Sequence, residues 1–187
     1  MKKLLHSEIL SERLSIEDAK SVKRLPVSVM MSNVRSLYNV GSMFRTCDAA
    51  LVNELILCGF TPHPPRAEIE KTALGAVNSV PWQYFKKESE AIEYLKSKKV
   101  KIIALEITNK KRSYTSLDIN DFPLCIVLGN ELTGIDQDVL DLCDDAIEIE
   151  MHGVKHSLNV SVAGGIAIYE SIRKWNVISL NGGKNEF

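Results

Sequence analysis

The sequence predicts an α/β fold: a mostly parallel sheet with helices on both faces. Apolar runs of strand length alternate along the chain with longer segments whose apolar residues recur at helical spacing. Several of these runs are apolar almost without interruption, as in CIVLG (125–129), which is typical of strands buried on both faces of a parallel sheet. At 187 residues the chain is short enough for one hydrophobic core, so we expect a single domain over residues 1–180.

The first part of the chain is expected to combine a helical extension with two strands. Residues 1–25 predict an N-terminal helical extension, split where Ser15 can cap a second helix. Strands are expected over 27–31 and 54–60. Between them, 40–51 has an apolar stripe at helical spacing and predicts an amphipathic helix.

The rest of the chain continues the alternation after one irregular segment. The segment 61–80 is expected to be irregular, because prolines forbid a long element at its start. The elements expected after it are a helix (88–98), a strand (100–107), a strand running into a glycine turn (123–131), a short helix (136–142), a strand (145–151) and a long helix (159–175). Residues 181–187 are expected to form a disordered tail.

The charge balance does not decide whether the chain binds a nucleic acid. The net charge of −1 counts against it, because phosphate contacts normally call for a basic surface. Basic residues nevertheless gather at Lys86-Lys87, at Lys96/Lys98/Lys99/Lys101 and at Lys110-Lys111-Arg112. A solvated helix face or loop tip explains each cluster taken singly.

Composition also predicts the cellular compartment of the protein and whether it binds a metal. No apolar run approaches the roughly 18 residues of a membrane span, and the first residues lack a signal-peptide core, so we expect a cytoplasmic protein with no membrane contact. The four cysteines are far apart in apolar contexts, which favours reduced, buried thiols. His152 and His156 lack a carboxylate partner, and we expect no metal site.

Three polar, glycine-containing segments each follow a predicted strand. They are 33–45 (NVRSLYNVGSMFR), 128–135 (LGNELTGI) and 151–162 (MHGVKHSLNVSV). Gly and Asn are also ordinary turn and cap residues. In an open parallel sheet, however, ligands bind beyond the carboxyl ends of the strands, so these segments are the candidate site.

Individual side chains in these segments have both structural and chemical interpretations. Arg45 lies off the apolar stripe of its helix and can hold a phosphate or stabilise an alkoxide, although a surface arginine is the commoner case. Glu131 can cap the helix near Asp136, pair with a lysine, fix a loop or pair with Arg45. Ser157 and Asn159 can be helix N-caps or site residues.

Small residues at 163–165 (Ala-Gly-Gly) lie inside the last predicted helix. Glycine costs a helix about 1 kcal/mol, so they indicate close approach by another segment or by a partner chain.

The dinucleotide-binding, Walker A and nucleophile-elbow patterns are absent from the sequence. Residue chemistry alone therefore predicts an α/β enzyme with a polar site at its strand ends.

Three motifs give the sequence a more specific resemblance. NVRSLYNVGSMFRTCDA (33–49), IVLGNELTGI (126–135) and SLNVSVA (157–163) resemble, in order and spacing, the motifs of the SpoU (TrmH-like) branch of the SPOUT RNA 2′-O-ribose methyltransferases. The resemblance covers most of the chain.

The resemblance implies a fold, a cofactor and an assembly. It implies a C-terminal deep trefoil knot whose loops bind S-adenosyl-L-methionine, and a homodimer packed through the knot and the last helix. It also implies transfer of a methyl group to a ribose 2′-hydroxyl of tRNA or rRNA. The positions that match the family's cofactor-binding residues are Leu128, Gly129, Ile149, Met151 and Leu158.

The resemblance further implies roles for the polar residues. Arg45 would act at the 2′-hydroxyl, either as the base or as an electrostatic partner, with Asn39, Glu131, Ser157 and Asn159 as positioning groups. Glu150 stands where many members have proline, which affects loop rigidity. Two alternatives remain open: an inactive RNA- or protein-binding module on the same fold, and a methyltransferase acting on a base or another small acceptor.

Overall fold

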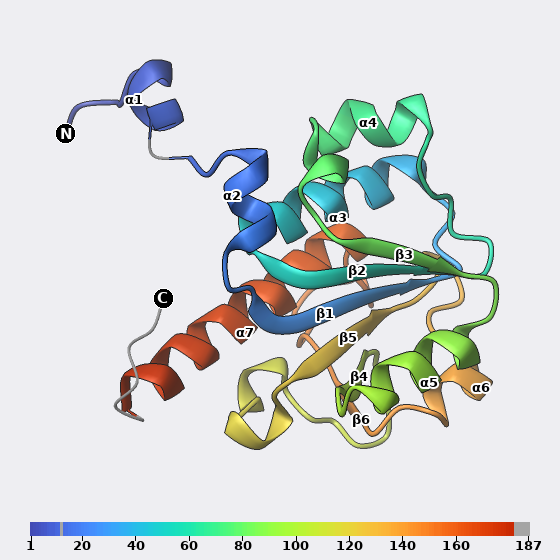
Figure 1. The fold of residues 1–187 in the computed structure, drawn as a ribbon. Coiled ribbons are helices and arrows are strands. Elements are labelled where there is room, and N and C mark those ends of the chain that lie inside the picture. Colours follow the sequence, from blue (N-terminus) through green and yellow to red (C-terminus); the bar gives the residue numbers. More distant parts are fainter. Residues whose placement is uncertain (12, 182–187) are drawn as a thin grey trace.

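Six parallel strands form the sheet in the computed structural model, which describes residues 1–11 and 13–181. The strand order is β3-β2-β1-β5-β4-β6, and every neighbouring pair is parallel (Figure 1). The strands are β1 (Leu25–Ser32), β2 (Val52–Cys58), β3 (Trp82–Phe85), β4 (Lys101–Leu105), β5 (Leu124–Leu128) and β6 (Asp145–Ile147). The predicted α/β class is confirmed, and the sheet is wholly rather than mostly parallel.

Helices cover both faces of this sheet, as predicted. They are α1 (His6–Ser11), α2 (Ile16–Ser21), α3 (Leu37–Ala49), α4 (Ala67–Ala73), α5 (Glu88–Ser97), α6 (Gln137–Leu140) and α7 (Val160–Asn181), with 3-10 turns η1 (Ala76–Asn78), η2 (Tyr114–Ser116) and η3 (Ile119–Asp121). The helices α3 and α7 lie on one face, and α5 and α6 lie on the other (Figure 1).

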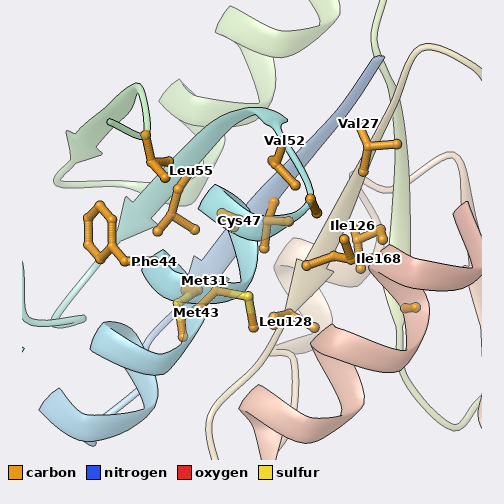
Figure 2. Close-up of a cluster of buried hydrophobic side chains, with 14 of the residues drawn as sticks. Val27, Met31, Met43, Phe44, Cys47, Val52, Leu55, Ile126, Leu128 and Ile168 are labelled. Atoms are coloured by element: carbon orange, nitrogen blue, oxygen red, sulfur yellow. The ribbon is translucent and has the colours of Figure 1, made fainter. Parts of the chain in front are cut away.

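The alternation of side chains along β1 divides the core into two layers. Val29 and Met31 belong to the cluster under α3 and α7, whereas Met30 between them belongs to the cluster under α5 and α6. Figure 2 shows the first cluster, with Met43 and Phe44 of α3 turned toward the strands. Both sheet faces are therefore buried, which explains the uninterrupted apolar runs in the sequence.

The small residues at 163–165 accommodate packing within the chain. A Cβ atom on Gly164 would lie 2.5 Å from Met43 Cε and 2.9 Å from Leu128 Cδ1. The close approach is therefore between α7 and the surface formed by α3 and β5. Of the two explanations left open by the sequence, another segment of the same chain is the one observed.

The segment 61–80 was wrongly expected to be irregular throughout. Its prolines do delay a helix, but α4 begins at Ala67 and ends at Ala73, and the C-cap Leu74 has a left-handed φ of 51°. The edge strand β3 was also not predicted, because it is four residues long and only Trp82 and Phe85 are partly buried. Trp82 packs edge-on against Phe44 at 6.1 Å between ring centroids.

The N-terminal extension contains the two expected helices. Ser15 caps α2 by accepting a hydrogen bond from the backbone N–H of Asp18. The Arg24 side chain donates to the carbonyls of Ala19, Val52 and Ser79, which ties the extension to the sheet.

Several smaller expectations have different outcomes. Helix α7 runs six residues further than expected, to Asn181, and residues 182–187 of the predicted tail lie outside the described residues. Three of the four cysteine thiols are buried, and all four are free. Among the described helices, none is long and apolar enough to cross a membrane.

Candidate functional site

The carboxyl ends of β4, β5 and β6 meet at one edge of the sheet, and a pocket of about 370 Å³ lies there. Three loops form most of its wall: the turn after β5, the segment after β6 and the segment that leads into α7. The lining residues are Leu105, Glu106, Ile107, Leu128–Gly134, Glu148, Ile149, Met151 and His156–Val160, with Ala163. Two of the three segments singled out from the sequence thus form one cavity.

All five residues matched to the family's cofactor-binding positions line this pocket. They are Leu128, Gly129, Ile149, Met151 and Leu158. The turn after β5 is so tight that a Cβ atom on Gly129 would lie 2.3 Å from the carbonyl carbon of Gly134. Glycine is therefore required there for close backbone approach, and the turn is closed by reciprocal backbone hydrogen bonds between Asn130 and Gly134.

Glu131 connects this turn to the start of α3. Its carboxylate accepts hydrogen bonds from the backbone N–H groups of Arg35 (2.9 Å) and Ser36 (3.0 Å) and from Asn39 Nδ2 (2.9 Å). Ser36 is the N-cap of α3, so the carboxylate lies where a helix N-terminus favours negative charge. Burial raises the pKa of Glu131, but these hydrogen bonds outweigh burial and leave the pKa below its ordinary value.

Asn39 and Asn159 extend the contact to α7. Asn159 Nδ2 donates to Asn39 Oδ1 at 3.1 Å, and Asn159 Oδ1 accepts from the backbone N–H and hydroxyl of Ser161. Asn159 is therefore both the cap of α7 and a link in the series Glu131–Asn39–Asn159. This series joins the ends of β5, α3 and α7, which are far apart in the sequence.

Arg45 and Ser157 lie outside this hydrogen-bonded series. Ser157 is exposed in the pocket wall, whereas Arg45 is exposed on α3 and is not among the residues that line the pocket. With the residues that the structure describes, Arg45 forms no ion pair and no side-chain hydrogen bond. The suggestion that Glu131 pairs with Arg45 is therefore wrong, because backbone N–H groups and Asn39 occupy its carboxylate. Of the other suggestions for Glu131, fixing a loop is the one observed.

Sequence reasoning assigned no role to two side chains that shape the pocket. Glu106 accepts from the backbone N–H of Ile135 (2.9 Å) and of Ile107 (2.9 Å). Asn130 donates to the carbonyl of Asn33 (2.8 Å) and accepts from the backbone N–H of Leu132 (2.8 Å). Glu106 was missed because it lies inside the expected strand 100–107, whereas β4 ends at Leu105.

An ion-pair network fixes the segment that approaches the pocket after β4. Arg112 pairs with Asp121 and with Asp145, each at 2.6 Å. The backbone of the same segment pairs with Glu148, which donates to the Arg112 carbonyl (2.8 Å) and accepts from the N–H of Tyr114 (2.9 Å). The position of Glu148 in the pocket wall therefore depends on this network.

Comparison with known proteins identifies relatives over most of the chain. The SpoU rRNA Methylase family model matches residues 26–169. The tRNA (guanosine(18)-2′-O)-methyltransferase of Escherichia coli (strain K12) is 32% identical over 151 residues, which cover 79% of this chain and 63% of that enzyme. The chain thus spans less than two thirds of the length of this relative.

Solved structures that resemble this chain belong to RNA-modifying enzymes as well. The Aquifex aeolicus TrmH/SpoU tRNA modifying enzyme superimposes with a TM-score of 0.77 at 26% identity, covering 91% of this chain and 86% of that one. The AdoMet-bound rRNA methyltransferase of Sinorhizobium meliloti gives a TM-score of 0.75 at 25% identity, covering 83% and 59%. With three motifs at one sheet edge and a family match over residues 26–169, the chain belongs to the SpoU rRNA methylase family.

Proposed function

We propose that this chain transfers a methyl group from S-adenosyl-L-methionine to a ribose 2′-hydroxyl of tRNA or rRNA. The observation that carries the proposal is the series Glu131–Asn39–Asn159, which lies beside the pocket and links the family's three motifs. The names of the E. coli and A. aeolicus relatives support RNA as the substrate, and the AdoMet-bound S. meliloti relative supports the cofactor.

The pocket suits a cationic, partly apolar cofactor. Its volume of about 370 Å³ lies in the range of small-molecule sites. Leu128, Ile149 and Leu158 would contact the flat adenine, while backbone groups of the turn after β5 would bind its polar edge. Three carboxylates, Glu106, Glu131 and Glu148, belong to the described lining, which includes no lysine or arginine. This charge favours a ligand with a sulfonium and an ammonium group.

The chemistry requires a proton to leave the ribose oxygen as the new bond forms. The bound cofactor would supply an electrophilic methyl group to the 2′-oxygen, and the hydroxyl proton would pass to solvent water. Arginine keeps its proton in proteins, so Arg45 suits stabilisation of the developing oxyanion or of a neighbouring phosphate. Asn39, Ser157 and Asn159 would orient the ribose, and Glu131 would keep the loop before α3 in place.

A deep trefoil knot is proposed for the C-terminal part of the chain. Its support is the path of residues 148–159, which leave β6 at one edge of the sheet and return to α7 beside β5. On the way they pair with 112–114 and line the same pocket as the turn 129–134. Pulling the two ends apart in an optical trap should give an extension shorter than that of an unknotted chain, and full extension would reject the knot.

A homodimer through the knot and α7 is also proposed. Apolar side chains remain exposed on this helix, with Val162 and Tyr169 each about half exposed and two helical turns apart. Arg45 is also exposed, on α3, and does not line the pocket of its own chain. Light scattering should give twice the chain mass for the wild type and a monomer for Val162→Asp, and a wild-type monomer would reject the dimer.

The test of the proposed activity is methyl transfer to RNA that lacks the modification. Wild type should place labelled methyl from S-adenosyl-L-methionine on tRNA or rRNA, and nucleoside analysis should recover it as a 2′-O-methylnucleoside. Arg45→Ala should retain fold and cofactor affinity but lose transfer. Label on a base would reject the ribose assignment, near-normal turnover by Arg45→Ala would reject the role of Arg45, and RNA binding without transfer would favour the inactive module.

A further inference from the structure

Three exposed ring side chains lie at the carboxyl ends of β2 and β3. Phe60 is 62% exposed, Tyr84 is 40% exposed, and His63 is also exposed between two prolines. The rings of His63 and Tyr84 have centroids 4.5 Å apart, and the His63 ring is stacked on Trp82 at 6.5 Å. We call Phe60, His63 and Tyr84 the aromatic platform. Since β2 and β3 are parallel to β1, the platform lies on the same edge as the candidate site (Figure 1).

Hydrogen bonds hold the platform to the segment that carries the first motif. Phe60 donates its backbone N–H to Asn33 Oδ1 (3.2 Å), and Tyr84 donates its hydroxyl to the carbonyl of Gly59 (2.7 Å). The Thr61 hydroxyl donates to the carbonyl of Met31 (3.0 Å) and accepts from the N–H of Val34 (3.0 Å). The rings are therefore exposed on an ordered support that is continuous with the site.

The basic side chains near this edge differ from the other basic clusters of the chain. Of the other clusters seen in the sequence, most members pair with a carboxylate: Lys96, Lys98, Lys101, Lys110 and Arg112. Lys99 and Lys111 form no ion pair with the described residues, but they lie away from the carboxyl ends of β1, β2 and β3. At the carboxyl edge, Arg35, Arg66, Lys86 and Lys87 are exposed and form no ion pair with the residues that the structure describes. We call these four the edge cations. Internal pairing thus leaves positive charge available on the side where substrate would approach.

We propose that the aromatic platform stacks unpaired bases of the substrate RNA while the edge cations contact its phosphates. Unpaired bases of RNA stack on aromatic side chains, and basic residues that track the backbone accompany such stacking. Charge complementarity favours a polyanion over an apolar protein partner. The inference rests on the proposed function, because the target ribose would bind at this edge of the sheet. The aromatic platform would then hold nucleotides that flank the target.

The first experiment measures RNA affinity separately from methyl transfer. The probes are a fluorescein-labelled single-stranded RNA oligonucleotide and an unmodified tRNA transcript, and the readout is fluorescence anisotropy. Phe60→Leu keeps an apolar side chain but removes the ring, and it should weaken binding of the oligonucleotide about 5- to 100-fold, the loss of one stacked base. Phe60→Trp should bind as well as wild type. Calorimetry of S-adenosyl-L-methionine binding should be the same for all three proteins.

A matched pair of lysines tests the edge cations. Lys87 precedes α5 at the carboxyl edge, whereas Lys99 follows the same helix at the opposite edge, and both are exposed. Lys87→Gln should reduce the slope of log affinity against log salt by about 0.7–0.9, the value for one phosphate contact. Lys99→Gln should leave the slope unchanged.

The outcomes separate this inference from the proposed function. Reduced affinity of Phe60→Leu, with no methyl transfer even by wild type, would support the platform and reject the methyltransferase activity. Methyl transfer by wild type, with unchanged affinity and unchanged KM for RNA in Phe60→Leu, would reject the platform and leave the activity standing. A wild-type protein that binds neither RNA probe would also reject the platform. Equal weakening by Lys87→Gln and Lys99→Gln would reject the edge cations as specific contacts.

Discussion

A single methyl group added to α7 should have opposite effects at two adjacent positions. Gly164→Ala places a Cβ atom 2.5 Å from Met43 Cε and 2.9 Å from Leu128 Cδ1, and both of these side chains are buried. Gly165→Ala meets nothing nearer than Thr46 Cγ2 at 3.9 Å, an ordinary van der Waals contact. The two substitutions change helix propensity equally, so any difference between them reports packing of α7 on α3 and β5.

The magnitude follows from two opposing contributions. Replacing glycine by alanine inside a helix stabilises it by about 1 kcal/mol. Inserting a methyl group into a packed core costs about 1–3 kcal/mol, and two contacts below 3.0 Å indicate the upper half of that range at Gly164. We therefore expect Gly164→Ala to lose about 1–2 kcal/mol of unfolding free energy and Gly165→Ala to gain up to about 1 kcal/mol.

Thermal unfolding followed by circular dichroism is the assay. For a chain of this size the two variants should differ in Tm by roughly 2–12 °C. The double variant Met43→Ala/Gly164→Ala should be more stable than the sum of the single effects predicts, because the shortened side chain makes room for the methyl group. Equal Tm values for Gly164→Ala and Gly165→Ala, or additive effects in the double variant, would refute the reasoning.

Two carboxylates give further predictions in which the sign of the pH dependence matters. Glu131→Gln keeps one acceptor oxygen but turns an amide donor toward backbone N–H groups, so it should cost about 2 kcal/mol at pH 7, measured by urea unfolding. The folded pKa of Glu131 is lowered, so this difference should be complete above the ordinary glutamate pKa of about 4.3 and should diminish below it; a pH-independent difference would count against the hydrogen bonds as its cause. Asp121→Asn removes the buried partner of Lys101 and Arg112 and should cost about 2–3 kcal/mol, since both cations are partly exposed. Burial raises the pKa of Asp121 but its hydrogen bonds lower it further, so this difference should likewise be lost only as pH falls below about 3.9, and an equal loss at pH 7 and pH 3 would contradict the assignment.

The sequence predicted most elements of the fold because their signals are local. The apolar runs of β1, β2, β4 and β5 and the stripe of α3 each specify their own burial. By contrast, β3 is defined by its pairing with β2 rather than by its own composition. The helix α4 is short and is held by packing on α3. Neither this packing nor the pairing of β3 with β2 leaves a pattern in the sequence of the segment itself.

The site shows the same division between local and non-local information. That Glu131 belongs to the candidate site could be predicted from its place after a buried strand. Its partners could not, because they depend on how the turn closed by Asn130 and Gly134 directs the carboxylate toward the start of α3, almost a hundred residues earlier. The position of Arg45 relative to the pocket depends in the same way on the rotation of α3 under α7. The sequence thus predicted candidate residues for the site, whereas the packing of helices on the sheet determines which of them are in contact.

Net charge was the least informative global property, and the structure explains why. The value of −1 is a sum over the whole chain, and it does not show that charges of opposite sign are separated along one edge of the sheet. The pocket is lined by carboxylates, which suit a cationic cofactor, while the edge cations lie beside the aromatic platform and suit phosphates. Most other basic residues of the predicted clusters are paired with carboxylates elsewhere on the surface. Two ligands of opposite charge must meet in the proposed reaction, and a neutral total with local separation of charge suits that requirement better than a uniformly basic surface would.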